Sequence, residues 1–252
     1  MKKVLSAAVC AAMALSVFGC ASETAETEAS ETAAAIDFDY MTYAEYDAAA
    51  LDTEVTVLAT VMATQSWWED QITVYAQAYD GDGAYFIYNM ACSEEDSASV
   101  VEGATILVTG YKSEWEGEIE ITDATFEFTD LVQENPMAPV DLTADFGNDD
   151  ALIAYQNRNF EMTGLTVEAI GDNGEAFFYK WDNSGSQGDD LYFVVSNGET
   201  TATFTVESYL TGADTDVYQT VEGLNVGDTI DVVGFLYWYQ GANPHITGVT
   251  VR

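Results

Sequence analysis

Residues Gly103–Tyr111 read GATILVTGY, and residues Gly227–Phe235 read GDTIDVVGF. The likeness continues beyond these stretches, because Gly117 and Gly241 follow at similar distances and an Ile-Thr pair succeeds each of them. Self-similarity at a fixed spacing indicates repeated structural units. The chain therefore contains two related modules, one after the other.

Strand-like segments precede the first copy of the pattern. Apolar and polar residues alternate over Ile72–Gln77, and Asp80–Gly83 supplies a turn before Ala84–Tyr88, which is typical of a β-hairpin. Ser93 is suited to begin a short helix, since Asp96 follows three residues later as in a capping box. The order is thus a hairpin, a short helix and then the repeated strand.

The second copy is preceded by the same order. Phe160–Ala169 corresponds to the opening strand, and Leu191–Ser196 and Thr201–Ser208 flank the Asn197-Gly198 turn. Asp214–Leu224 then corresponds to the short helix. Each module consequently has three strands, a helix and two further strands.

This order resembles the OB-fold, a five-stranded Greek-key barrel with a helix between its third and fourth strands, over nearly all of residues 40–252. We predict a mainly β fold with two small OB-like barrels in tandem, module 1 at 36–135 and module 2 at 136–252. Asn135-Pro136 and Pro139 mark the boundary, because proline does not fit a central strand. Another small β-barrel or a sandwich is the alternative fold.

The N-terminal residues have the pattern of an export signal. Lys2 and Lys3 precede an apolar run from Val4 to Phe18, which is too short to span a bilayer. Val17–Cys20 resembles the lipobox of bacterial lipoproteins, although Phe18 departs from the usual small residue. The resemblance implies a signal peptide at 1–19, cleavage before Cys20 and a lipid on the Cys20 thiol. An ordinary signal peptide with a chance cysteine is the alternative.

Residues 20–35 are acidic and contain no aromatic and no large apolar side chain. Such a segment cannot bury enough surface to offset its ordering entropy, so we expect a disordered tether. The whole layout resembles the tandem-OB lipoproteins of gut clostridia, a resemblance that implies no activity. We therefore expect a lipid-anchored protein on the extracytoplasmic face of the cell membrane.

The charge balance is strongly acidic. Six Lys and Arg residues face 44 Asp and Glu residues, for a formal net charge of -38. Nucleic-acid binding and docking on anionic lipids both begin with basic side chains, so we expect no nucleic-acid partner and no basic membrane patch. Weak, diffuse binding of divalent ions to so acidic a surface stays open.

Neither a catalytic residue nor a metal or cofactor site emerges from the motifs. His245 is the only histidine and no Gly-x-Ser-x-Gly elbow exists, so we expect a hydrogen-bonded structural residue. Cys92 has no second cysteine beside it and is expected to be a buried thiol. Counted from Asp80 as an EF-hand loop, the twelfth position is Ala91 rather than glutamate, so a turn is expected there. We predict a protein that is not an enzyme.

Aromatic residues give the more specific signal. All five tryptophans fall in the loops that join strands one and two or strands four and five, which flank ligands in OB-folds. Ring faces stack on sugars, bases or peptide side chains. The alternative is that these rings plug the barrel ends. The predicted ligand-binding residues are Trp67, Trp68, Trp115, Trp181, Trp238 and Tyr239.

Three functions compete. The main prediction is an exported, lipid-anchored, non-catalytic binding protein that takes a glycan or a peptide through its aromatic loops. The first alternative is a structural or interaction protein of the cell envelope that docks another protein. The most distant alternative is a nucleic-acid-binding OB protein. The oligomeric state, and the side of the barrel that Tyr75, Tyr85 and Tyr88 face, are left open.

Overall fold

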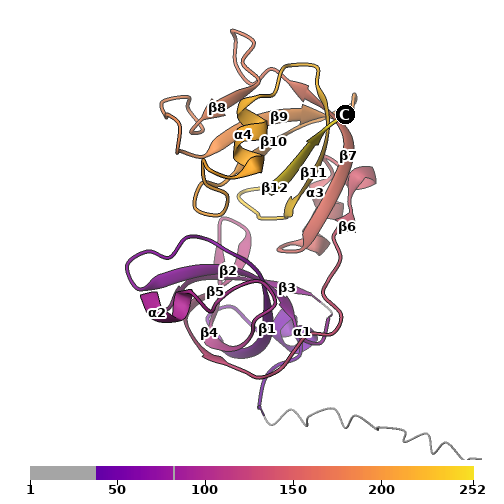
Figure 1. Ribbon diagram of the computed structural model, residues 1–252. Helices are drawn as coiled ribbons and strands as arrows, with labels where there is room; N and C mark the ends of the chain where they lie inside the picture. Colours follow the sequence, from indigo (N-terminus) through magenta and orange to yellow (C-terminus); the bar gives the residue numbers. More distant parts are fainter. Residues whose placement is uncertain (1–37, 82) are drawn as a thin grey trace, which may run out of the picture. The chain divides into compact units, whose positions relative to one another are not determined.

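The computed structural model describes residues 38–81 and 83–252, of which Asp39–Arg252 form one compact unit. The predicted signal peptide at 1–19, Cys20 and the predicted tether at 20–35 lie outside the described residues. In the described part, no helix has the length and apolar character that a membrane crossing requires. The described chain forms two closed β-barrels that follow one another, which confirms the predicted fold class (Figure 1).

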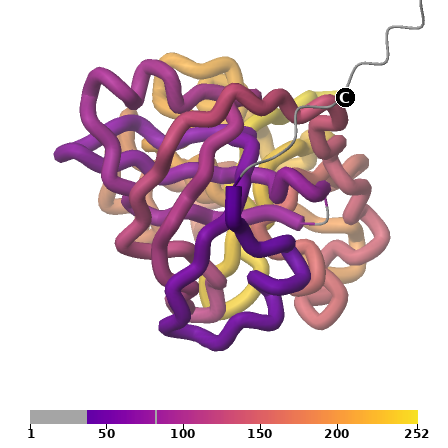
Figure 2. Tube along the Cα trace, turned by 90° about the horizontal axis from the view of Figure 1, so that it is seen from below, coloured from indigo at the N-terminus to yellow at the C-terminus, as the bar shows by residue number. Residues whose placement is uncertain are grey.

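The first barrel has five strands in the order β1-β2-β3-β5-β4, closed by pairing between β1 and β4. All neighbours are antiparallel except β3 and β5, which are parallel, as the OB topology requires. Figure 2 follows this part of the chain from indigo to magenta. The strands are β1 (Glu54–Thr64), β2 (Gln71–Ala78), β3 (Ala84–Ala91), β4 (Thr105–Trp115) and β5 (Glu118–Phe128).

Two short helices belong to the first barrel. Helix α2 (Glu94–Ser97) lies between β3 and β4, and the backbone N–H of Asp96 donates to the side chain of its N-cap Ser93, as predicted. Helix α1 (Tyr43–Ala48) precedes β1, and its buried Tyr46 packs edge-on against Tyr85 with ring centroids 4.9 Å apart. Tyr46 thereby belongs to the hydrophobic core of the barrel.

Lys112 has an unusual place for a lysine, because it is buried on β4 beside α1. Its Nζ donates hydrogen bonds of 2.8–3.1 Å to the carbonyl oxygens of Tyr46, Asp47 and Ala49 at the end of the helix. A cation there satisfies carbonyls that have no partner within the helix. One of the few basic residues is thus used for folding rather than for the surface.

The second barrel repeats the topology with additions. Strands β7, β11, β12, β10 and β9 form a ring that the pairing of β7 with β9 closes, and β10 and β12 are its parallel neighbours. Strand β6 pairs with β7 and strand β8 pairs with β9, both outside the ring. Helix α4 (Asp216–Glu222) lies between β10 and β11. The strands are β6 (Val140–Asp141), β7 (Asn159–Glu168), β8 (Phe177–Tyr179), β9 (Leu191–Ser196), β10 (Thr201–Val206), β11 (Thr229–Phe235) and β12 (His245–Val251).

The segment between β6 and β7 supplies apolar side chains to the second barrel. It contains η1 (Thr143–Asp145), α3 (Asp149–Leu152) and η2 (Ile153–Tyr155). Phe146 and Leu152 from this segment are buried in the barrel core, where Phe146 meets Phe204 edge-on at 6.1 Å. The segment therefore contributes buried side chains to the core of the second barrel, as α1 does to the core of the first.

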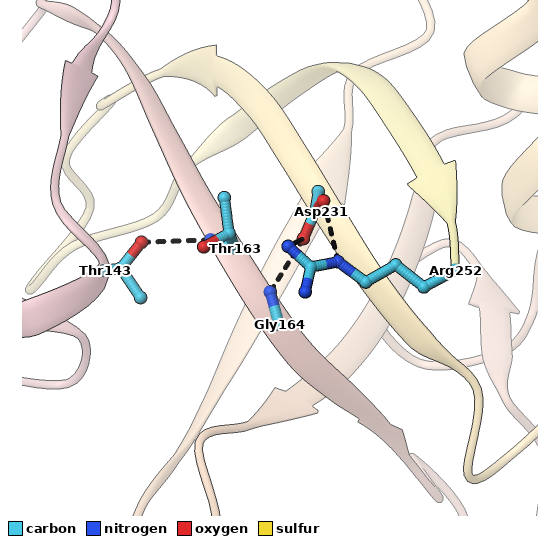
Figure 3. Close-up of polar contacts among 5 residues, drawn as sticks. All are labelled: Thr143, Thr163, Gly164, Asp231 and Arg252. Atoms are coloured by element: carbon cyan, nitrogen blue, oxygen red, sulfur yellow. Dashed lines mark hydrogen bonds and ion pairs between the residues drawn. The ribbon is translucent and has the colours of Figure 1, made fainter.

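Polar contacts hold the segment and the barrel edge together (Figure 3). The backbone N–H of Thr163 on β7 donates to the Thr143 hydroxyl at 3.0 Å. Asp231 on β11 accepts from the backbone N–H of Gly164 at 2.7 Å and forms an ion pair with Arg252 at 2.8 Å. The hydrogen bond and ion pair with Arg252 lower the pKa of Asp231 below its usual value.

Candidate ligand-binding site

The candidate site begins with the outer face of β2 and β3, the face on which OB barrels bind ligands. On β2, Val74 and Ala76 point into the barrel core, so Tyr75 between them points outward. On β3, Tyr85 and Ile87 belong to the same core, so Phe86 points outward too. Two large aromatic rings therefore stand on the outside of the first barrel.

Both rings are nevertheless buried, because the second barrel covers them. Tyr75 and Phe86 form a separate apolar cluster with Phe235 at the end of β11. The rings of Tyr75 and Phe235 are stacked with centroids 4.5 Å apart, and the Tyr75 hydroxyl is hydrogen bonded to Nδ1 of His245 at 2.7 Å. Burial lowers the pKa of His245 to about 3, so the imidazole is neutral and structural, as the sequence indicated.

Hydrogen bonds fix the β4–β5 hairpin of the first barrel against the second. Gln156 donates from Nε2 to the carbonyl of Gly117 at 2.8 Å, and Asn157 donates from Nδ2 to that of Ile119 at 3.0 Å. The backbone N–H of Trp238 donates to Oε2 of Glu118 at 2.8 Å. The junction is thus specified by apolar packing and by directed polar contacts.

Glu118 is fully buried in this junction. Desolvation raises the pKa of its carboxyl group well above the usual range. Oε1 of Glu118 and Oδ1 of Asn157 are both buried without a hydrogen-bond partner. Protonation of Glu118 would add a donor to its carboxyl group, in line with the raised pKa.

Beside the packed cluster the two barrels leave a cleft of about 330 Å³, which we call the junction cleft. Its size is that of a small-molecule site. Three of its lining rings are largely exposed: Trp68 at 64%, Tyr209 at 58% and Tyr88 at 44%. Tyr237 and Phe86 complete the aromatic lining. The cleft therefore gathers several exposed aromatic rings beside the outer surface of β2 and β3.

A loop contact sets the position of Tyr209 in the cleft. The backbone N–H of Ser66, in the loop between β1 and β2, donates to the carbonyl oxygen of Tyr209 at 2.7 Å. The Ser66 hydroxyl donates to the same oxygen at 3.2 Å. Trp68 follows two residues later in this loop, so one backbone contact fixes ring-bearing segments from both barrels.

Glu207 is the acidic group of the junction cleft. Its oxygens accept from the backbone N–H groups of Tyr209 at 3.3 Å and Leu210 at 2.8 Å, which orders the turn after β10. Burial and the nearby carboxylate of Asp190 raise the pKa of Glu207 to about 7. Its charge therefore changes near neutral pH.

The corresponding face of the second barrel is open. A groove of about 770 Å³, the second-barrel groove, runs along β10 and the loop after β11. Thr201 and Thr203 of β10, Tyr192 of β9 and Tyr239 of the loop contribute to its lining. Asp149 and Asp150 stand on its other side. This groove has fewer exposed rings than the junction cleft and more acidic groups.

The structure does not bring the six predicted ligand-binding residues into one site. Trp67 is half-buried, and its indole N–H donates to the carbonyl of Cys92 at 2.8 Å. Trp238 is buried in the core of the second barrel. Trp68 lines the junction cleft and Tyr239 the second-barrel groove, whereas the exposed Trp115 and Trp181 line neither. A role in ligand contact stays a prediction for the exposed members.

Sequence reasoning missed most of the junction cleft. It placed Tyr88 on the third strand without deciding which side of the barrel the ring faces. It did not include Tyr209, Tyr237 or Glu207 among the predicted ligand-binding residues. Cys92 is a free, buried cysteine, as expected. Within 38–81 and 83–252, no group of three or more His, Cys, Asp or Glu side chains is arranged to hold a metal ion.

No family model matches the sequence, and no curated protein matches it at a significant level. Among solved structures, the chain is similar to the Ifi202 HINa domain in complex with 20-bp double-stranded DNA, at 11% identity and a TM-score of 0.33, over 80% of this chain and 96% of that one. A murine DNA-binding protein bound with double-stranded DNA gives 10% identity and a TM-score of 0.33, over 78% and 94%. A deletion mutant of the single-stranded DNA-binding protein from Thermus aquaticus gives 11% and 0.23, over 79% and 93%.

These neighbours correct two expectations. The main function predicted from the sequence, a surface protein that binds a glycan or a peptide through aromatic loops, was wrong, and so was the exclusion of a nucleic-acid partner, because the neighbours are bound to DNA or named for it. The exclusion rested on net charge, which describes the whole surface rather than one face. At such low identities and TM-scores the likeness concerns the fold alone, so it assigns no ligand to this chain.

Proposed function

We propose that the tandem barrels are a non-catalytic binding module whose ligand site is the junction cleft. One observation carries this proposal: the cleft lies on the β2–β3 face of the first barrel and is lined by exposed rings from both barrels. Exposed aromatic side chains in a concave site bury large areas when a ligand covers them. Neither barrel alone contains the complete lining.

The rigidity of the junction supports the same proposal. Tyr75, Phe86 and Phe235 are packed beneath the cleft, and Ser66 joins the loop of one barrel to Tyr209 of the other. A site whose walls are already fixed loses little conformational entropy when a ligand binds. The docking of the barrels thus prepares the site before any ligand arrives.

A binding panel tests the proposal. Calorimetric titration of the purified protein would use cationic, zwitterionic and neutral small molecules, together with oligo(dT) because the fold neighbours include DNA-binding proteins. We expect a binder whose affinity falls about tenfold or more in Tyr209→Ala, which matches a stacking contact of about 1–3 kcal/mol.

Trp181→Ala is the matched control, because Trp181 is exposed and lies outside the cleft. If Tyr209→Ala and Trp181→Ala lower the affinity of a ligand equally, the junction cleft is not its site. A panel in which no compound binds would also overturn the proposal. If oligo(dT) is the ligand whose binding depends on Tyr209, the junction cleft remains the site and the ligand is a nucleic acid. Its salt dependence would then be weak, because Lys112 is buried and Arg252 is paired with Asp231.

We also propose that a lipid on Cys20 holds the module at the membrane. The residues Val17–Cys20 support this proposal through their lipobox pattern. Wild-type protein should enter the membrane fraction and incorporate labelled fatty acid, whereas Cys20→Ala should do neither. Wild-type protein that stays in the soluble fraction without label after export would contradict the anchor.

A further inference from the structure

We infer that the junction cleft binds an organic cation, a ligand that carries an ammonium group. This inference rests on the proposed function and names its ligand class. Its basis is the combination of ring faces from Trp68, Tyr88 and Tyr209 with the carboxyl group of Glu207 in one cleft. Each kind of group favours positive charge for its own physical reason.

The rings favour a cation because the face of an aromatic ring carries partial negative charge. Tyr88 is held by further rings: Phe86 is stacked with Tyr88 at 6.2 Å and meets Tyr237 edge-on at 5.2 Å. Tyr237 in turn is stacked on His245 at 4.4 Å. Phe86, Tyr88, Tyr237 and His245 therefore form one packed aromatic group in the lining of the cleft.

The carboxyl group of Glu207 favours a cation because no basic side chain in the described part of the chain pairs with it. Asp190, the charged neighbour of Glu207, is itself acidic and accepts from the backbone N–H and the hydroxyl of Ser208. The other titratable groups that face Glu207 are Tyr75, Tyr192 and the neutral His245. A bound ammonium group would relieve the repulsion between two carboxylates.

No lysine or arginine of the described residues lines the cleft, and two of these residues have partners elsewhere. Lys112 is bound by carbonyls at the end of α1, and Arg252 is paired with Asp231. An anionic ligand would thus meet no compensating charge in the cleft. A neutral ligand would gain ring contacts only. A cation gains from the rings and from Glu207 together.

The test compares two ligands of equal shape. Choline is titrated into the full protein beside its neutral isostere, in which a tert-butyl group replaces the trimethylammonium group. We expect choline to bind about tenfold more tightly, since desolvated cation–π contacts are worth up to about 2 kcal/mol. Glu207→Gln should weaken choline and leave the isostere unchanged, and Glu199→Gln, at an exposed turn, should change neither.

The pH profile gives an independent readout. Because Glu207 loses its proton near pH 7, choline affinity should rise between about pH 6 and 8, and Glu207→Gln should remove that rise. Equal binding of choline and the isostere, both dependent on Tyr209, would overturn the cation inference and keep the site. If choline does not bind but another ligand binds in a Tyr209-dependent way, the cation inference is likewise overturned and the site is kept. Binding that ignores Tyr209→Ala would overturn both proposals.

Discussion

The two barrels share one strand order and differ in what covers the face of their second and third strands. In the first barrel, the second barrel covers Tyr75 and Phe86 on the β2–β3 face and leaves the junction cleft beside them. In the second barrel, the β9–β10 face stays open as the second-barrel groove. The difference shows that one topology can give a docking face in one copy and an open groove in the other.

The cause lies in the residues that point outward. On β3, Tyr85, Phe86 and Ile87 are all buried in succession, so both faces of that strand are apolar. On β10, Phe204 points inward, whereas Thr201 and Thr203 are exposed. Apolar outer residues must be covered, and threonines tolerate water. The chemistry of the outward positions therefore decides which face docks.

Loss of the stacked ring between the barrels should have the largest effect on stability. Phe235→Ala should lower the free energy of unfolding by about 3–5 kcal/mol, because it empties a buried aromatic site. Val233→Ala is the control, since Val233 is exposed on the same strand and should change stability by less than about 1 kcal/mol. Urea unfolding measures both. Equal effects of the two changes would show that the junction contributes no special stability.

Removal of the buried acid should have the next largest effect. Glu118→Ala leaves the N–H of Trp238 without its acceptor and should cost about 1–3 kcal/mol. Glu118→Gln keeps an acceptor and a donor and should cost less. Because the pKa of Glu118 is raised, its contribution is present at low pH and is lost as pH rises through that pKa. Wild-type protein should therefore lose stability relative to Glu118→Gln as pH rises above 4.5, the ordinary pKa of the group. Parallel curves would mean that Glu118 is not the group.

The cleft acid should have a smaller effect, visible as a difference between pH profiles. The pKa of Glu207 is raised from 4.5 to about 7, so wild-type protein should lose stability relative to Glu207→Gln as pH rises from about 4.5 to 7. Comparison at each pH cancels the opposite contribution of His245, whose lowered pKa adds stability as pH rises from about 3 to 6.5. A difference that is constant over this window would show that Glu207 titrates normally.

An exposed tryptophan should have the smallest effect. Trp181 is 70% exposed in the long loop before β9, so Trp181→Ala should change stability by no more than about 0.5 kcal/mol. Trp238→Ala removes a buried ring from the core of the same barrel and should cost about 3 kcal/mol. Thermal unfolding of the two variants sharpens the contrast between loop and core tryptophans. Similar melting temperatures would contradict it.

The fold could be predicted because it depends on local signals. Alternation, turn residues, the N-cap at Ser93 and the internal repeat at Gly103 and Gly227 are all readable in one dimension. The same signals placed Trp67, Trp68, Trp181 and Trp238 in loops and Trp115 at the end of the fourth strand, where the structure has them. Each of these features is set by neighbours in the sequence.

The site could not be predicted because it depends on contacts between residues far apart. Tyr75 meets Phe235 and His245, and Ser66 meets Tyr209, across more than a hundred residues of chain. No pattern within either segment names its partner. One signal was present: the unbroken apolar run Tyr85-Phe86-Ile87 indicates a strand covered on both faces, which pointed to a second surface over β3. The identity of that surface required the structure.

The most direct test is a double-mutant cycle between Tyr75 and Phe235, because its result depends on the docking of one barrel on the other. Leucine replaces each residue singly and together, and urea unfolding gives the coupling free energy. We predict a coupling of about 0.5–1.5 kcal/mol, the usual value for a stacked aromatic pair. A control cycle between Tyr75 and Phe204, which belong to different apolar clusters, should give a coupling below about 0.5 kcal/mol. A Tyr75–Phe235 coupling no larger than the control would contradict the claim that the second barrel covers the ligand face of the first.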